Sequence, residues 1–281
     1  MSHGAAEPLM TWVDGESQSS VSILDRGLQY GDGVFETIAC RRGCLRFVAQ
    51  HVARLQQGCE RLQIAFDAHR KLTAELERAS RLAPPVAIIK VIVTRGDALA
   101  RGYGSVGRES PRRIVTMWPD APLPESLRAQ GAAVRFGQLR LARNPRLAGI
   151  KHLNRLEQVL ARAEWHDAGT FESLLTDSEG HLVSGTMSNV FALKGQTLVT
   201  PPVDQCGVAG VLRAVVLREA AHFRLEPSIA PVSVQRLLNA DAVFLTNARI
   251  GVLPVSRLGG RTIPIDARTR ALAAHVEQLD A

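Results

Sequence analysis

Apolar residues follow two patterns along the first 118 residues, one typical of strands and one typical of helices. Short apolar runs that are typical of strands cover residues 9–13, 33–40, 44–48, 86–94 and 113–118. A glycine-bearing loop separates the second and third runs, which predicts a hairpin. Residues 50–64 and 67–82 instead repeat apolar side chains every three to four positions, which predicts helices. The N-terminal part is therefore predicted to be a small α/β domain over residues 1–118.

Prolines crowd residues 119–124 without apolar periodicity, so residues 119–125 are predicted to form an interdomain linker. Beyond it, strands are predicted at residues 132–136, 172–176, 182–183, 190–194, 197–200, 242–246 and 252–255. Helices are predicted at residues 154–168, 211–223 and 267–279. Strands and helices mix without regular alternation, which indicates an α/β fold of the α+β kind. Residues 126–281 would form the second, larger domain with a strand-rich core.

Composition narrows the class of protein. Apolar residues make up 46% of the chain and charged residues 22%, which is typical of a globular protein. No apolar run approaches the roughly 20 residues that span a bilayer, and residues 1–10 carry no secretory pattern. The four cysteines, Cys40, Cys44, Cys59 and Cys206, form no CxxC pair, so we expect reduced thiols in a cytoplasmic protein. The histidines are scattered, and no metal site is expected.

The net charge of +7 comes from dispersed arginines rather than from a basic block. No aromatic and basic residues alternate as a single-stranded nucleic acid would require, so no nucleic-acid partner is expected. A dispersed positive balance favours small anionic ligands, such as phosphates and carboxylates.

Only four of the 34 basic residues are lysines, and Lys151 differs from the other three by its setting. It stands in a mostly apolar approach to a predicted helix, where desolvation would depress its pKa. A lysine of this kind can attack an aldehyde as a primary amine, which arginine cannot do. By position alone, however, a lysine flanking a helix start is the simpler interpretation.

Three further features would suit a phosphate-bearing cofactor. Gly207–Arg213 carries two glycines into a predicted helix, where unpaired backbone N–H groups and the helix dipole favour an anion. Thr246-Asn247-Ala248 ends a buried strand with small polar groups, and Arg54 interrupts an apolar helix face. Each feature alone is more often structural, and their occurrence together with Lys151 favours a cofactor site.

Seven ordered motifs give the chain a specific resemblance over roughly residues 8–260. They are Asp25–Thr37 (DRGLQYGDGVFET), His51–Leu55 (HVARL), Thr94–Gly96 (TRG), Lys151–Glu157 (KHLNRLE), Ser188–Phe191 (SNVF), Gly207–Arg213 (GVAGVLR) and Thr246–Ala248 (TNA). The set resembles the fold-type IV enzymes that depend on pyridoxal 5′-phosphate. Within that family, the lysine motif and the Phe-Glu-Thr ending are most similar to the aminodeoxychorismate lyases.

The resemblance implies a role for each matching residue. Lys151 would form the Schiff base and move protons, with Thr37 helping to orient it. The implied cofactor-binding residues are Arg54, Lys151, Ser184, Asn189, Val208, Ala209, Thr246, Asn247 and Ala248. The implied substrate-binding residues are Tyr30, Arg101 and Tyr103, although Arg101 fits a solvated loop arginine equally well. The family fold also implies two domains with the cofactor between them, in a homodimer.

One position departs from the family pattern. The family usually has a glutamate before the Ser-Asn-Val-Phe motif, where it pairs with the cofactor's ring nitrogen, and this chain has Ser184 there. A neutral hydroxyl would not keep that nitrogen protonated, which weakens the cofactor as an electron sink. We therefore expect Ser184 to favour elimination over transamination, although an altered or degraded function would also fit.

The implied activity is conversion of 4-amino-4-deoxychorismate to 4-aminobenzoate and pyruvate in folate biosynthesis. The alternative is an aminotransferase of the same fold that acts on D- or branched-chain amino acids. A cofactor-carrying binding protein without turnover is the third possibility, and only the missing glutamate favours it.

Overall fold

The computed structural model describes residues 7–66 and 69–279. The chain divides into two compact units. The first comprises residues up to 122 together with residues 150–154, and the second comprises residues 123–149 and 155–279.

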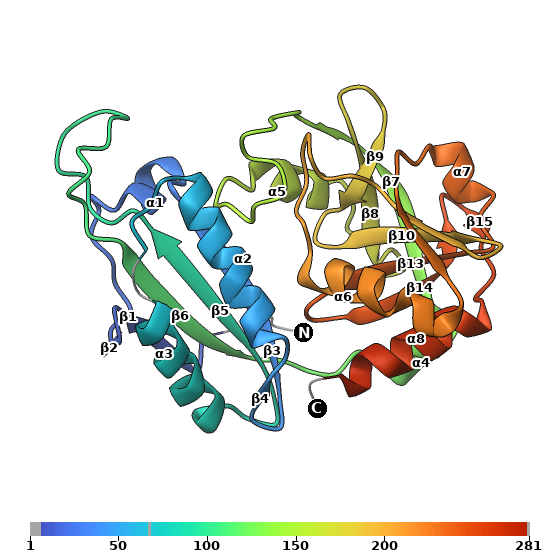
Figure 1. Cartoon of the computed structure of the whole chain (residues 1–281), viewed down its shortest axis with the longest axis horizontal. Coiled ribbons are helices and arrows are strands. Elements are labelled where there is room, and N and C mark those ends of the chain that lie inside the picture. Colours follow the sequence, from blue (N-terminus) through green and yellow to red (C-terminus); the bar gives the residue numbers. More distant parts are fainter. Residues whose placement is uncertain (1–6, 67–68, 280–281) are drawn as a thin grey trace. The chain divides into compact units, whose positions relative to one another are not determined.

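The first unit is a six-stranded antiparallel sheet with helices (Figure 1). Its elements are β1 (Met10–Val13), β2 (Glu16–Ser17), α1 (Arg26–Tyr30), β3 (Gly33–Arg41), β4 (Cys44–Leu45), α2 (Val48–Arg61), α3 (His69–Leu82), β5 (Val86–Thr94) and β6 (Arg112–Pro119). The strand order is β2-β1-β6-β5-β3-β4. Two pairs of strands that are consecutive in sequence do not pair in the sheet: β2 with β3, and β4 with β5.

Alternation along the central strands decides which face is covered. Val34 and Ile38 of β3 are buried, while Phe35 and Thr37 between them are half-buried. Since successive side chains of a strand point to opposite faces, β3 presents one buried face, which includes Glu36, and one partly exposed face. Helix α2 packs on β3 and α3 on β6, where their apolar residues join one core (Figure 1).

Residues 150–154 return to the first unit and pair with the edge of β3. The backbone N–H of Phe35 donates to the carbonyl oxygen of Lys151 at 2.9 Å. The N–H of Leu153 donates to the carbonyl oxygen of Gly33 at 3.0 Å, and Val34 pairs with His152 as an antiparallel bridge. Lys151 is therefore held against β3 by an isolated β-bridge, and helix α5 (Leu156–Arg162) begins five residues later at Leu156.

The second unit is built on a nine-stranded mixed sheet (Figure 1). Its strands are β7 (Ala132–Leu141), β8 (Glu172–Asp177), β9 (Leu182–Gly185), β10 (Asn189–Lys194), β11 (Thr197–Thr200), β12 (Glu226–Ile229), β13 (Ala242–Asn247), β14 (Gly251–Leu258) and β15 (Arg261–Thr262). Its helices are α4 (Glu125–Gln130), α5 (Leu156–Arg162), α6 (Val211–Glu219), the 3₁₀ helix η1 (Ala220–Phe223), α7 (Val234–Leu238) and α8 (Ala267–Gln278). The order is β12-β11-β10-β13-β14-β7-β8-β9, with β15 paired to β14.

The centre of this sheet is apolar on both faces. Phe191 of β10 and Phe244 of β13 are fully buried and stack with their ring centroids 4.9 Å apart. Strands buried on both faces read as continuous apolar runs, which is how β10 and β13 read in the sequence. Helix α6 packs against β13 and α8 against β14 (Figure 1).

The α/β fold class predicted from the sequence is confirmed. The helix expected over residues 154–168 is wrong in extent, because α5 ends at Arg162. Beyond it, Trp165 is buried and donates from Nε1 to the carbonyl oxygen of Thr170 at 3.2 Å, and Asp167 accepts from the N–H of Thr170. Those contacts fix a turn in place of the last helical residues. The start of the helix expected from residue 67 falls outside the described residues, which resume at residue 69.

In the described part of the chain, no helix combines the length and apolarity that crossing a membrane requires. All four cysteines are unpaired thiols.

Candidate functional site

Lys151 and Thr37 both belong to the first unit. Thr37 lies on β3 and Lys151 lies beside it. The Nζ atom of Lys151 lies 4.3 Å from the ring centroid of Phe35. Phe35 and Thr37 are two residues apart on β3, so their side chains share a face of the sheet. Lys90, which alternation places toward solvent, is half-buried instead, with Nζ 5.4 Å from the same ring. The aromatic ring therefore carries two amines on this face.

Arg54 is fixed by a buried carboxylate on the opposite face of β3. Its guanidinium donates from Nε to Oε1 of Glu36 at 2.7 Å and from Nη2 to Oε2 at 2.6 Å. Nδ1 of His51 lies 2.6 Å from the same Oε2. Burial by itself raises the pKa of Glu36, but the charge of Arg54 and hydrogen bonds from His51 and Arg54 outweigh it and lower the pKa to about 2. A bidentate pair of this kind holds the arginine in one orientation.

Sequence reasoning gave no role to Glu36, although it stands in the quoted Phe-Glu-Thr motif. A glutamate on the apolar side of a predicted strand could have indicated a buried ion pair, because charged residues are rarely buried without a partner.

Tyr30 and Tyr103, two predicted substrate-binding residues, are brought together in the first unit. Their ring centroids lie 5.3 Å apart in an edge-to-face arrangement. Arg26, which was assigned no role, joins them because its guanidinium lies 5.1 Å from the Tyr30 centroid and donates to the carbonyl oxygen of Tyr103 at 2.9 Å. It also reaches the carbonyl oxygens of Gly102 and Gly104 at 3.4 and 3.3 Å. Arg101 lies in the same loop and is exposed.

In the second unit, the glycine-rich segment before α6 is fastened at both of its sides. The N–H of Gly149 donates to the carbonyl oxygen of Gly207 at 3.0 Å, and the N–H of Ala209 donates to that of Gly149 at 2.9 Å. Asn189 donates from Nδ2 to the carbonyl oxygen of Val208 at 2.9 Å. A Cβ atom at Gly210 would collide with the Asn189 side chain, so this close approach requires glycine.

Helix α6 begins beside this segment without a side-chain cap. Its first intrahelical bond runs from the N–H of Ala214 to the carbonyl oxygen of Gly210. The N–H groups that precede Ala214 in the helix are the orphan donors of a helix start and suit an anion. Arg213 itself is buried and donates to Pro201 and Thr200, so its charge supports the local fold.

Thr246 is the penultimate residue of β13 and pairs with Asn189 in the sheet register. It is 1% exposed, and its Oγ1 atom is buried with no hydrogen-bond partner. An unpaired buried hydroxyl costs free energy unless a ligand satisfies it. Asn247 instead serves the following turn, because its Oδ1 accepts from the N–H groups of Arg249 and Ile250, both at 2.9 Å. Ala248 lies within that turn.

Ser184 is buried on β9, where its hydroxyl donates to the carbonyl oxygen of Gly185 at 2.9 Å. The carboxylate that organises this region is Glu172, which is fully buried on the neighbouring strand β8. It accepts from the hydroxyls of Thr186 at 2.6 Å and Ser188 at 2.8 Å. Glu172 therefore shapes the loop before Asn189, a role that sequence reasoning missed.

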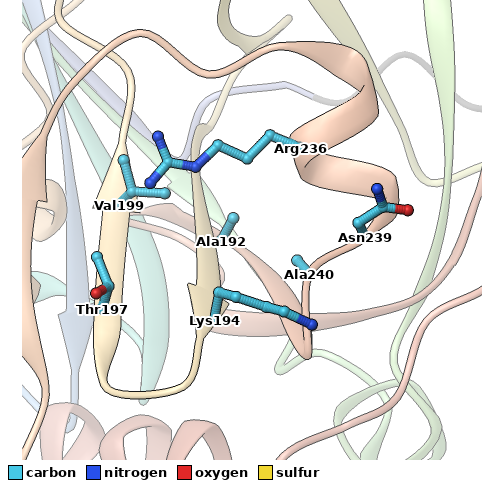
Figure 2. A pocket seen from close by; sticks show the side chains of 7 residues that line it. All are labelled: Ala192, Lys194, Thr197, Val199, Arg236, Asn239 and Ala240. Atoms are coloured by element: carbon cyan, nitrogen blue, oxygen red, sulfur yellow. The ribbon is translucent and has the colours of Figure 1, made fainter.

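Lys194 and two buried cysteines lie outside the predicted site. Lys194 and Arg236 line a pocket that contains none of the predicted site residues (Figure 2). The Nζ atom of Lys194 is paired with Asp241 at 2.6 Å. Burial raises the pKa of Cys59 to about 12 and that of Cys206 to about 11, which keeps both thiols protonated and unreactive.

The predicted residues fall on both units. The first unit holds Tyr30, Thr37, Arg54, Arg101, Tyr103 and Lys151, and the second holds Ser184, Asn189, Val208, Ala209, Thr246, Asn247 and Ala248. The orphaned hydroxyl of Thr246, the uncapped start of α6 and the glycine approach at residue 210 fit a phosphate group. The primary amine of Lys151 is the group among the predicted residues that can bind an aldehyde covalently.

Comparison with known proteins agrees with these chemical properties. The family described as Amino-transferase class IV matches residues 33–258. An aminodeoxychorismate lyase of Vibrio harveyi is 35% identical over 259 residues, which cover 92% of this chain and 94% of that protein. A putative branched-chain-amino-acid aminotransferase of Methanocaldococcus jannaschii is 33% identical, over 88% of this chain and 86% of that one. The crystal structure of 4-amino-4-deoxychorismate lyase from Pseudomonas aeruginosa superposes with a TM-score of 0.91 at 44% identity, covering 97% of this chain and 100% of that chain.

Proposed function

Because the chain belongs to the class IV aminotransferase family, whose enzymes depend on pyridoxal 5′-phosphate, we propose that it is an aminodeoxychorismate lyase. It would convert 4-amino-4-deoxychorismate to 4-aminobenzoate and pyruvate, a step of folate biosynthesis. The observation that carries this proposal is the 44% identity to the Pseudomonas aeruginosa lyase over nearly the whole of both chains.

The residues that would hold the cofactor have distinct tasks. Lys151 would bind its aldehyde through Nζ. The N–H of Val208, the N–H groups at the start of α6 and the Thr246 hydroxyl would bind its phosphate. Ala209 would hold this segment in place, because its N–H donates to the carbonyl oxygen of Gly149 at 2.9 Å. Arg54 would add a positive charge whose direction Glu36 fixes.

Asn189 would support the phosphate site indirectly, since its side chain donates a hydrogen bond to the carbonyl oxygen of Val208 and fixes that segment. Asn247 would do the same by fixing the turn that contains Ala248. Neither side chain needs to contact the cofactor to perform these tasks.

Lys151 would also transfer the proton during the reaction. The cofactor, when bound, withdraws electrons from the carbon that bears the substrate's amine and makes its C–H bond acidic. The Nζ atom of Lys151 would remove that proton as a general base. The bond from the ring to the enolpyruvyl oxygen would then break with its electron pair on that oxygen, and the ring would become aromatic. The enolate that leaves would take up a proton and tautomerise to pyruvate. Thr37, on the Phe35 face of β3, would orient the amine.

The loop of Arg101 and Tyr103 would contact the substrate, together with Tyr30. Arg26 would keep that loop in place, because its guanidinium reaches three successive carbonyl oxygens of residues 102–104. The exposed guanidinium of Arg101 would pair with a substrate carboxylate.

Ser184 would favour elimination over transamination. Its hydroxyl is neutral, so it would not hold a proton on the cofactor's ring nitrogen as a carboxylate would. Elimination tolerates a weaker electron sink, since the departing enolpyruvyl oxygen takes the electron pair.

The second candidate function is an aminotransferase of the same fold. The 33% identity to the Methanocaldococcus jannaschii protein and the 31% identity to a D-alanine aminotransferase of Bacillus licheniformis favour it. That reaction needs an amino donor and an oxo-acid acceptor, whereas the lyase needs its substrate alone.

The protein would act as a homodimer in the cytoplasm. Helix α5 exposes Leu156, Val159 and Leu160 at 75%, 61% and 60%, an apolar stripe at helical spacing that a second copy could cover. The unpaired state of its cysteines fits a reducing compartment. Light scattering at micromolar concentration would test the dimer by its mass.

A product assay would test the proposed activity. Purified protein supplied with enzymatically made 4-amino-4-deoxychorismate should release equal amounts of 4-aminobenzoate and pyruvate without any added oxo acid. Borohydride should fix the cofactor to the peptide that contains Lys151, and Lys151→Ala should abolish both labelling and turnover. Lys90→Ala is the matched control, because it removes the other amine beside Phe35. Amino transfer from D-alanine or a branched-chain amino acid without any 4-aminobenzoate release would favour the second candidate instead.

A further inference from the structure

Two histidines and a glutamate converge where helix α6 ends. Glu219 is the last residue of α6, His222 lies in η1, and His275 comes from the C-terminal helix α8. Oε2 of Glu219 lies 3.1 Å from Nδ1 of His222 and 2.9 Å from Nε2 of His275. Among residues 7–66 and 69–279, this is the only group of three or more His, Cys, Asp and Glu side chains whose potential ligand atoms all lie within 4.8 Å of one another.

The distances suit a small divalent cation. Zn²⁺ binds imidazole nitrogen and carboxylate oxygen at about 2.0–2.2 Å, so neighbouring ligand atoms of a tetrahedral site are about 3.3 Å apart. The two oxygen–nitrogen distances at Glu219 are a few tenths of an ångström shorter. Small side-chain rotations would therefore open the group around an ion without moving the helices.

Neighbouring side chains already orient the three ligands. Nε of Arg218 donates to Oε1 of Glu219 at 2.7 Å, which leaves Oε2 directed at the histidines. The ring of Phe223 packs edge-to-face on His275 with centroids 5.5 Å apart. Hydrogen bonds and packing of this kind around the ligands commonly fix metal sites.

We propose that Glu219, His222 and His275 form a binding site for one Zn²⁺ or similar transition-metal cation per chain, with the fourth coordination position open to water. The site goes beyond the proposed lyase activity and uses none of its residues. It would fasten α8 to the end of α6, since each helix contributes a ligand. The side chain of Glu219 is 9% exposed and that of His222 is 70% exposed, so the ion would sit at the surface with access from solvent.

Sequence analysis expected no metal site, and the reason is physical. Glu219 and His222 have the i, i+3 spacing that places two ligands on one helical face. The third ligand comes from a different helix, and only packing of α8 against α6 and η1 brings it near.

Co²⁺ provides the direct test, because its visible absorption reports tetrahedral coordination by nitrogen and oxygen. Holoenzyme that has been dialysed against chelator should bind one Co²⁺ per chain, and Zn²⁺ should displace it. His222→Ala and His275→Ala should each weaken binding at least about tenfold. His181→Ala is the matched control, since His181 is also exposed and lies near Asp177 and Glu179 but outside the site.

A second measurement separates the site from misfolding. Zn²⁺ should raise the melting temperature of the wild type and of His181→Ala but not that of His222→Ala, whose exposed side chain leaves the core intact. The proposal is overturned if the wild type binds no Co²⁺, if both site variants bind as tightly as the wild type, or if His181→Ala removes the binding.

Discussion

Replacing Glu36 by glutamine keeps the shape of a buried side chain and removes its charge. The carboxylate is 1% exposed and accepts hydrogen bonds from Arg54 on α2, with His51 beside it. Its pKa lies at about 2 in the folded chain against an ordinary value of 4.5. This difference of about 2.5 pH units corresponds to about 3 kcal/mol of folding free energy, at about 1.4 kcal/mol per unit.

The sign of the pH dependence follows from the lowered pKa. A carboxyl whose pKa falls on folding stabilises the protein above its unfolded pKa of 4.5 and loses that contribution as the pH falls toward 2. At pH 7, Glu36→Gln should therefore lower the free energy of unfolding by about 3 kcal/mol, within the range for breaking a buried ion pair. At pH 3 the difference from wild type should shrink to about 1 kcal/mol.

Urea unfolding followed by circular dichroism, at both pH values, would measure these differences. Glu60→Gln is the matched control, because it removes an exposed carboxylate from α2, the helix that carries Arg54, and should cost less than about 0.5 kcal/mol. The reasoning is refuted if Glu36→Gln costs less than about 1 kcal/mol at pH 7, or if its cost does not shrink at pH 3.

Three further variants test the proposed roles. Thr246→Val should weaken cofactor binding about tenfold, the equivalent of one hydrogen bond, and should leave the melting temperature unchanged. Thr200→Val is its control: the hydroxyl of Thr200 donates to the carbonyl oxygen of Val190 at 2.9 Å, so its loss should lower the melting temperature instead. Fluorescence titration would measure cofactor binding, and thermal scans would measure the melting temperature. Equal changes in the melting temperatures of the two variants would contradict the reasoning. Ser184→Glu should raise amino transfer from D-alanine, and a flat transfer rate beside intact lyase activity would show that this position does not select the reaction. Arg26→Lys should raise KM several-fold more than it lowers kcat, because lysine cannot reach three carbonyl oxygens at once; steady-state assays that find KM unchanged would exclude a role for the clamp in substrate binding.

The sequence by itself determined the elements whose signal is local. Residues 86–94 are rich in β-branched side chains, and they form β5 over the same bounds. Short elements such as α1 and α7 escaped prediction, because five residues are too few to display a helical period. The role proposed for Lys151 also starts from the sequence, since a lysine in a chain that otherwise uses arginine is visible in the composition.

Tertiary structure alone decided what those residues contact. Lys151 lies over Phe35 because residues 150–154 pair with the edge of β3, although more than a hundred residues separate the two segments. Glu36 contacts Arg54 because α2 packs on β3, and His275 contacts Glu219 because α8 packs beside α6. Hydrogen bonds between distant segments leave no periodicity in the chain, because their geometry exists only after the core has formed. The sequence therefore specified which groups can react or bind, and packing specified which of them meet.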